Sequence, residues 1–76
     1  MKMVRVALGS LVADPENPRT HDTKNLAAIA SSLKHHGQVE PLVVQKSTRM
    51  IIAGNGRAQA MRSLGWKDCD AVMLDV

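Results

Sequence analysis

The stretch MIIAGNGRAQAMRSLGW, residues 50–66, predicts a strand that passes through a tight turn into a helix. The adjacent apolar residues 50–53 are typical of a buried strand, and Gly54 ends it. Residues 55–64 carry a helical pattern, with Asn55 as the expected N-cap. The turn between these two elements is the point from which the rest of the fold can be worked out.

The end of this helix is marked by a glycine followed by a tryptophan. Gly65 fits the left-handed position that commonly terminates a helix. Trp66 follows directly, at the place where a large apolar side chain commonly folds back onto the last turn. We therefore expect Trp66 to cover the core rather than to stack on a ligand.

The remaining patterns predict an α+β domain. Residues 9–22 contain Pro15 and Pro18 and are expected to form an irregular surface loop. Apolar spacing predicts the other elements: a strand at 3–8, a helix at 24–36 that is capped by Asp22 or Thr23 and ended by Gly37, a strand at 42–45 joined to 50–53 as a hairpin, and a final strand at 70–76. The expected order is β-loop-α-β-β-α-β.

Size and composition limit the classes of function. The 76 residues fit one small domain, 1–76, with a net charge of +3. One Trp and no Phe or Tyr exclude an aromatic platform for single-stranded nucleic acid. One Cys excludes an intramolecular disulfide, and the His and Cys residues lack a metal-ligand spacing, so no metal site is expected. No apolar stretch reaches membrane-spanning length, and a cytoplasmic protein without membrane contact is expected.

Two interpretations of the turn before the second helix remain open on spacing alone. Gly54 and Gly56 let a ligand oxygen approach a helix N-terminus, where backbone N–H groups and the dipole favour anions. Helical spacing puts Arg57 on the same face as Ala60, Met61 and Leu64, at the N-terminal end of the buried stripe. Its guanidinium would therefore join those amides in a phosphate clamp. Alternatively, the glycines only shape the turn and Arg57 bonds a loop carbonyl. The dinucleotide-binding and P-loop glycine patterns do not match.

Several pieces of the sequence occur in an order typical of one superfamily. They are NPR at 17–19, the helix ending LKHHG, GQVEPLVV at 37–44, MIIAGNGRAQAMRSLGW at 50–66 and the closing strand. From about Leu11 to Leu74 the chain resembles the N-terminal domain of the ParB/sulfiredoxin-like superfamily. The resemblance implies a small β-α-β-β-α-β domain with two helices and a mixed sheet. It also implies nucleotide binding: CTP with a divalent metal in ParB-type partition proteins, which switch a DNA clamp, and ATP in sulfiredoxins and related kinases.

The resemblance further implies which residues hold the ligand, CTP or ATP with Mg²⁺. Arg57 matches the arginine that closes the phosphate-binding Gly-x-x-Arg motif. Arg19 matches an arginine near the same pocket. The loop that wraps the phosphates corresponds to Gly54, Asn55 and Gly56, and the Gly-x-x-Gln-Pro-Leu segment that lines the nucleotide corresponds to Gly37, Gln38, Pro41 and their neighbours up to Leu42.

Departures from the family pattern change what is expected. Asn55 and Gly56 replace the glutamate and the first arginine of Gly-Glu-Arg-Arg in the partition proteins. An amide is a poorer Mg²⁺ ligand than a carboxylate, so binding is expected more than hydrolysis. Glu40 stands where the family has glutamine before the proline and adds a negative charge. Asn55 also occupies the place of the sulfiredoxin cysteine, and Cys69 is out of position, so sulfiredoxin activity is rejected.

The Gly-Asn-Gly-Arg form is similar to the ParB-like domains of phage and mobile-element proteins, which are often described as nucleases. A metal-dependent nuclease or phosphotransferase, with Glu40 or Asp22 as the catalytic carboxylate, is therefore one alternative. A non-catalytic protein-interaction domain is another. The expected partners are a nucleotide, DNA reached through a partner or a further domain, and a second copy of the chain in a homodimer.

Overall fold

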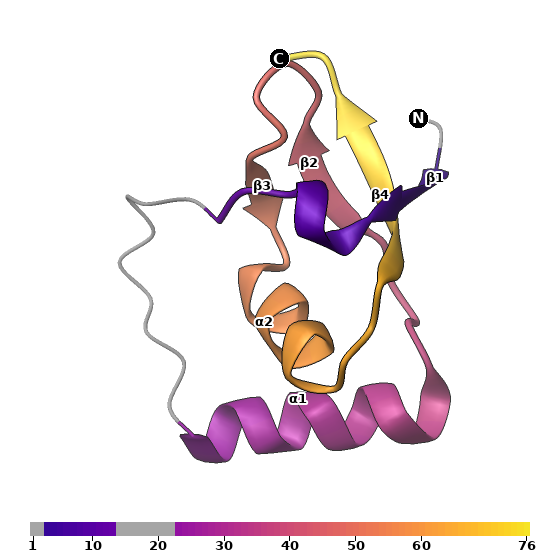
Figure 1. Cartoon of the computed structure of the whole chain (residues 1–76), viewed down its shortest axis with the longest axis vertical. Coiled ribbons are helices and arrows are strands. Elements are labelled where there is room, and N and C mark those ends of the chain that lie inside the picture. The colour runs from indigo at the N-terminus through magenta and orange to yellow at the C-terminus, as the bar shows by residue number, and fades with distance from the viewer. Residues whose placement is uncertain (1–2, 14–22) are drawn as a thin grey trace.

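The computed structural model describes residues 3–13 and 23–76 and has the predicted α+β architecture (Figure 1). Its elements are β1 (Met3–Ala7), a 3-10 turn (Leu8–Ser10), α1 (Thr23–His36), β2 (Leu42–Gln45), β3 (Ile51–Ala53), α2 (Asn55–Ser63) and β4 (Asp68–Leu74). Within these described residues the strands form one mixed sheet of order β1-β4-β2-β3. β4 runs antiparallel to β1 and parallel to β2, and β2 and β3 form the predicted antiparallel hairpin.

The core lies where α2 is enclosed between the sheet and α1 (Figure 1). Strand alternation places Leu42 and Val44 of β2 inward beside Cys69 and Ala71 of β4, and all four are fully buried. The core is completed by Leu8 and Leu11 after β1, Leu33 of α1, Ile51 of β3, and Ala58, Ala60 and Met61 of α2. The described core is therefore built without Phe or Tyr, mainly from aliphatic side chains.

The apolar stripe predicted for α2 is only partly correct. Ala60 and Met61 are buried, but Leu64 is 36% exposed. Gly56 and Ala58, which lie off the predicted stripe, are buried as well. The reason is that α2 contacts α1 on one side and the sheet on another, so burial extends around more of its circumference than a single stripe.

The prediction that Asn55 is the N-cap of α2 is wrong. Gly54 is the N-cap and has a left-handed backbone, with φ of 101°, and Asn55 is already the first helical residue. The Asn55 amide donates to the carbonyl of Ile51 at 3.2 Å. The chain turns from β3 into α2 within one residue, and only a left-handed conformation permits so sharp a turn.

The end of α2 confirms the predicted glycine cap. Gly65 has φ of 80°, and its N–H donates to the carbonyl of Arg62 at 3.0 Å. The N–H of Trp66 donates to the carbonyl of Met61, also at 3.0 Å, which completes a Schellman motif. The Trp66 side chain packs against the core as predicted. Gly37 ends α1 in the same left-handed region.

The segment after β1 is more regular than the predicted loop at 9–22. Leu8–Ser10 form a 3-10 turn, and Val12 makes an isolated parallel bridge to Met50 beside β3. Leu11 is buried, and Arg62 donates to its carbonyl at 3.2 Å. Apolar side chains at this point favour packing over a solvated loop. The part of the predicted loop at 14–22 lies outside the described residues.

Four strand boundaries also differ from the predicted ones, and in two of them β3 begins at Ile51 rather than at residue 50 and β4 ends at Leu74 rather than at residue 76. β1 ends at Ala7 rather than at residue 8, because Leu8 enters the 3-10 turn. β4 begins at Asp68 rather than at residue 70, because Asp68 and Cys69 pair with Ala7 and Val6 of β1. Tertiary pairing with β1 thus shifts β4 by two residues toward the N-terminus of its predicted span.

Candidate functional site

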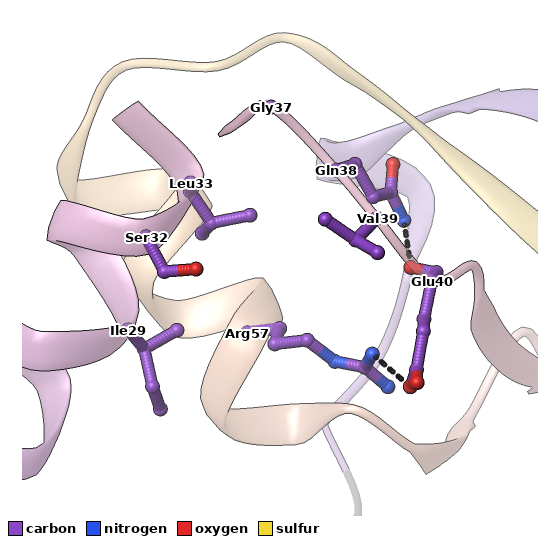
Figure 2. A pocket seen from close by; sticks show the side chains of 8 residues that line it. All are labelled: Ile29, Ser32, Leu33, Gly37, Gln38, Val39, Glu40 and Arg57. Atoms are coloured by element: carbon purple, nitrogen blue, oxygen red, sulfur yellow. Dashed lines mark hydrogen bonds and ion pairs between the residues drawn. The ribbon is translucent and has the colours of Figure 1, made fainter. Parts of the chain in front are cut away.

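A pocket of about 350 Å³ opens between the C-terminal half of α1, the segment that leads to β2, and the first turn of α2. Figure 2 shows the side chains that line it: Ile29, Ser32, Leu33, Gly37, Gln38, Val39, Glu40 and Arg57. One wall is apolar and comes mostly from α1. The charged groups, Glu40 and Arg57, face each other on the other side.

Arg57 reaches this pocket from the first turn of α2, and its side chain passes close over the preceding turn. A Cβ added to Gly54 would lie 3.1 Å from Nη2 of Arg57 and 2.5 Å from Cδ2 of Leu42. Gly54 is therefore required twice, for its left-handed backbone and for the space it leaves. The Arg57 side chain is 29% exposed, so the guanidinium is held at the protein surface rather than extended into solvent.

Glu40 is the partner of this guanidinium. Nη1 of Arg57 donates to Oε2 of Glu40 at 3.1 Å (Figure 2). The Glu40 side chain is 76% exposed. The alternative in which Arg57 bonds a loop carbonyl is therefore replaced by an ion pair between residues from two different segments. The cation at the head of α2 already has an anion beside it.

Gln38 fixes the segment that carries Glu40. Its carboxamide nitrogen donates to the carbonyl of Asp70 at 2.8 Å and to the carbonyl of Glu40 at 3.0 Å. Its carboxamide oxygen accepts from the N–H of Asp70 at 2.7 Å. The side chain thus joins the segment before β2 to β4, and its amide group is engaged with main chain.

The apolar wall was not predicted as part of a site. Ile29 and Leu33 were expected only in the core stripe of α1, yet both line the pocket. Leu33 belongs to the core as well, where it is 5% exposed. Val39 is 77% exposed. In Figure 2 its side chain extends toward the pocket from the segment that leads to β2. The sequence offered no signal for this wall, because a single exposed apolar residue such as Val39 is common on protein surfaces.

The predicted site residues divide into three groups. Gly37, Gln38, Glu40 and Arg57 line the pocket, and Gly54 lies against the guanidinium. The other residues of the turn and segment do not line it: the Asn55 amide points back to Ile51, Gly56 is buried within α2, and Pro41 is half-buried at the start of β2. Arg19 and the catalytic candidate Asp22 lie outside the described residues.

The residues of this pocket suit a phosphate ligand, whereas they offer a metal ion few ligands of their own. A guanidinium beside a helix N-terminus suits phosphate oxygens, since both supply positive charge and N–H donors. In the part of the chain that the structure describes, no cluster of at least three His, Cys, Asp or Glu side chains could hold a metal. Mg²⁺ is commonly held by one or two carboxylates together with substrate phosphates, and Glu40 is the carboxylate at this pocket.

Comparison with known proteins assigns the family. The ParB N-terminal domain profile matches residues 1–76, and the chain belongs to this family. It is 31% identical over 75 residues to a nucleoid occlusion protein of Geobacillus thermodenitrificans, covering 93% of this chain and 27% of that protein. It is 31% identical over 74 residues to the ParB-like nuclease domain-containing protein YnaK of Escherichia coli, covering 97% of this chain and 84% of that one.

Solved structures confirm the predicted fold. A C-terminally truncated chromosome-partitioning protein ParB from Caulobacter crescentus, complexed with CTP-γ-S, matches with a TM-score of 0.90 at 22% identity, over 100% of this chain and 46% of that chain. Sulfiredoxin from Arabidopsis thaliana matches with a TM-score of 0.87 at 17% identity, over 100% and 88%. Across residues 3–13 and 23–76, no helix is both long and apolar enough to cross a membrane.

Proposed function

We propose that this ParB N-terminal domain binds the phosphates of a nucleoside triphosphate, with CTP as the first candidate, in the pocket beside Arg57. The observation that carries the proposal is the position of this guanidinium. It lies over Gly54 at the head of α2 and faces an open pocket of about 350 Å³, a volume within the range of small-molecule sites. The structural likeness to a ParB solved with CTP-γ-S supports the choice of ligand.

Each side of the pocket suits a different part of such a ligand. Arg57 and backbone N–H groups in the first turn of α2 would hold phosphate oxygens, because a helix N-terminus presents N–H donors and the positive end of the helix dipole to an anion. Gly54, Asn55 and Gly56 would bring that backbone close to the phosphates. Arg19 would supply a second guanidinium, and Gly37 and Gln38, which line the pocket, would contact the ligand.

Nucleotide binding would serve a DNA-associated protein. The chain spans 27% of the length of the nucleoid occlusion protein it matches, so contact with DNA would involve a partner or a further domain. Mg²⁺ would accompany the nucleotide, bound through Glu40 and the ligand's own phosphates. A second copy of the chain, in a homodimer, would be a further partner.

Titration of the folded protein with CTP, ATP and GTP, each with and without Mg²⁺ and with and without DNA, tests the proposal. We expect saturable binding of at least one nucleotide by calorimetry, with chemical-shift changes at Arg57 and Gly37. Sedimentation with and without the nucleotide measures dimerisation. A folded sample that binds none of the nucleotides would contradict the proposal. Cleavage of single-stranded DNA in Mg²⁺ or Mn²⁺, lost in Glu40→Gln, would instead support the nuclease alternative.

A further inference from the structure

We propose that Glu40 regulates the phosphate site: its carboxylate occupies the Arg57 guanidinium when no ligand is present and makes anion binding there depend on a divalent cation. This inference rests on the proposed function and concerns the same pocket. It starts from the contact of 3.1 Å between Nη1 of Arg57 and Oε2 of Glu40. A phosphate that binds this guanidinium has to replace that carboxylate.

The two partners of the ion pair are held unequally. Arg57 is 29% exposed, and its Nη2 lies only 3.1 Å from where a Cβ on Gly54 would stand. Glu40 is 76% exposed, so solvent surrounds most of its side chain. An exposed ion pair contributes little free energy because water screens it and two side chains lose rotamer freedom. Glu40 is thus the partner that can leave, and breaking the ion pair costs little free energy.

The backbone keeps the displaced carboxylate near the pocket. Gln38 bonds the carbonyl of Glu40 at 3.0 Å and both backbone groups of Asp70, so the segment stays in place when the Glu40 side chain turns away. A phosphate on Arg57 would then lie near a second negative charge. Repulsion between two like charges this close weakens binding of the phosphate severalfold, even in water.

A divalent cation removes this cost. Mg²⁺ takes carboxylate and phosphate oxygens as ligands, so a cation between Glu40 and the bound phosphate replaces repulsion with two attractive contacts. Without such a cation, Glu40 favours the closed ion pair. The single carboxylate therefore competes with a bare anion and cooperates with a cation-bound one.

The test compares two probes, inorganic tripolyphosphate and CTP, in EDTA and in MgCl₂. We expect Glu40→Gln to bind either probe about tenfold more tightly than the native protein in EDTA, since it loses both the competing contact and the repulsion. In MgCl₂ the native protein should gain affinity, and Glu40→Gln should gain about tenfold less. Asp75→Asn removes the same charge just after β4, at a residue that does not line the pocket, and serves as the control.

The outcomes separate this inference from the proposed function. If the native protein binds CTP and Arg57→Ala weakens that binding, but Glu40→Gln leaves the affinity in EDTA unchanged, the role of Glu40 is refuted and the nucleotide site stands. Equal gains from MgCl₂ in the native protein, Glu40→Gln and Asp75→Asn would refute it too. If none of these proteins binds either probe, both proposals are wrong. Amide spectra of Glu40→Gln that match the native ones verify that the fold is retained.

Discussion

The Gln38 carboxamide forms a two-way hydrogen-bonded pair with the backbone of Asp70, donating to its carbonyl at 2.8 Å and accepting from its N–H at 2.7 Å. A side chain here does what a neighbouring strand does elsewhere in the sheet. It satisfies both backbone groups of one β4 residue and fixes the segment that carries Glu40. The spacing between Glu40 and Arg57 therefore depends on an uncharged side chain, whose hydrogen bonds to Glu40 and Asp70 go to main chain rather than to the Glu40 carboxylate or the Arg57 guanidinium.

Gln38→Met should lower the free energy of unfolding by about 1–3 kcal/mol, because it leaves the N–H and carbonyl of Asp70 without their side-chain partner. Urea denaturation followed by Trp66 fluorescence measures the change. Gln59→Met introduces the same substitution at an exposed position of α2 and should change stability by less than about 0.5 kcal/mol. Equal losses for the two variants would mean that the Gln38 contacts contribute nothing specific.

Gly54→Ala should destabilise the domain more than an alanine at another glycine, because strain and collision act together there. A Cβ would meet Leu42 at 2.5 Å, and φ is 101°. We expect a loss of about 2–4 kcal/mol from the left-handed backbone and the overpacking combined.

Two other glycines separate these contributions. Gly65→Ala also has a left-handed backbone, with φ of 80°, but nothing within 4 Å, and should cost about 1 kcal/mol. Gly9→Ala has neither feature and should be close to neutral. Thermal denaturation of the three variants gives the order. A Gly54→Ala protein no less stable than Gly65→Ala would show that Leu42 and Arg57 yield freely.

Arg57→Ala should weaken binding of the nucleotide by about 30-fold, or about 2 kcal/mol, the scale of a lost charge-assisted contact. Arg57→Lys keeps the charge but loses the planar fork of donors, so it should recover only part of the affinity. Calorimetric titration with CTP and Mg²⁺ measures both. Lys46→Ala removes a positive charge from the exposed turn between β2 and β3 and is the matched control. An affinity loss as large in Lys46→Ala would point to a general charge effect.

Cys69 should make stability fall in alkali. Burial raises the pKa of its thiol above the usual value of 9.0, with the nearby Arg5 opposing that shift. Above pH 9.0 the unfolded chain loses the thiol proton while the folded protein keeps it, so the free energy of unfolding decreases as pH rises until the folded thiol also ionises.

Comparison with Cys69→Ala isolates this contribution, because the two proteins differ only in this side chain. The native protein should lose more stability than the variant between pH 8 and pH 10 in urea unfolding. Its thiol should also react with a disulfide reagent far more slowly when folded than in denaturant, since Cys69 is fully buried. Parallel pH profiles for the two proteins would remove the thiol from the explanation.

Local signals predicted most of the elements, and contacts between distant residues accounted for what was missed. The helix at 24–36 and the cap at Gly65 and Trp66 depend on neighbours along the chain, so spacing was sufficient to predict them. The sequence predicts Asn55 as the N-cap because its side chain is a good cap. The sharp exit from β3 instead makes Gly54, with its left-handed backbone, the N-cap.

The candidate site was only partly predictable for the same reason. Arg57 was expected at the head of α2, and the family resemblance placed Gly37 and Gln38 near it. No local pattern predicts that Glu40 pairs with a residue 17 positions away, or that Gln38 bonds one 32 positions away. The role of Ile29 and Leu33 in the pocket was not predictable for a different reason. An apolar residue that lines a pocket and one that fills a core have the same helical periodicity.

The order of the sheet has a consequence for synthesis. β4 follows β1, β2 and β3 along the chain, yet it lies between β1 and β2 and supplies the ladder partner of β1. Until residues 68–74 emerge from the ribosome, β1 has no strand to pair with, because β4 separates it from the β2–β3 hairpin in the finished sheet. A nascent chain stalled before Asp68 would therefore expose a strand edge to chaperones and proteases, and emergence of β4, rather than formation of the helices, would complete the sheet.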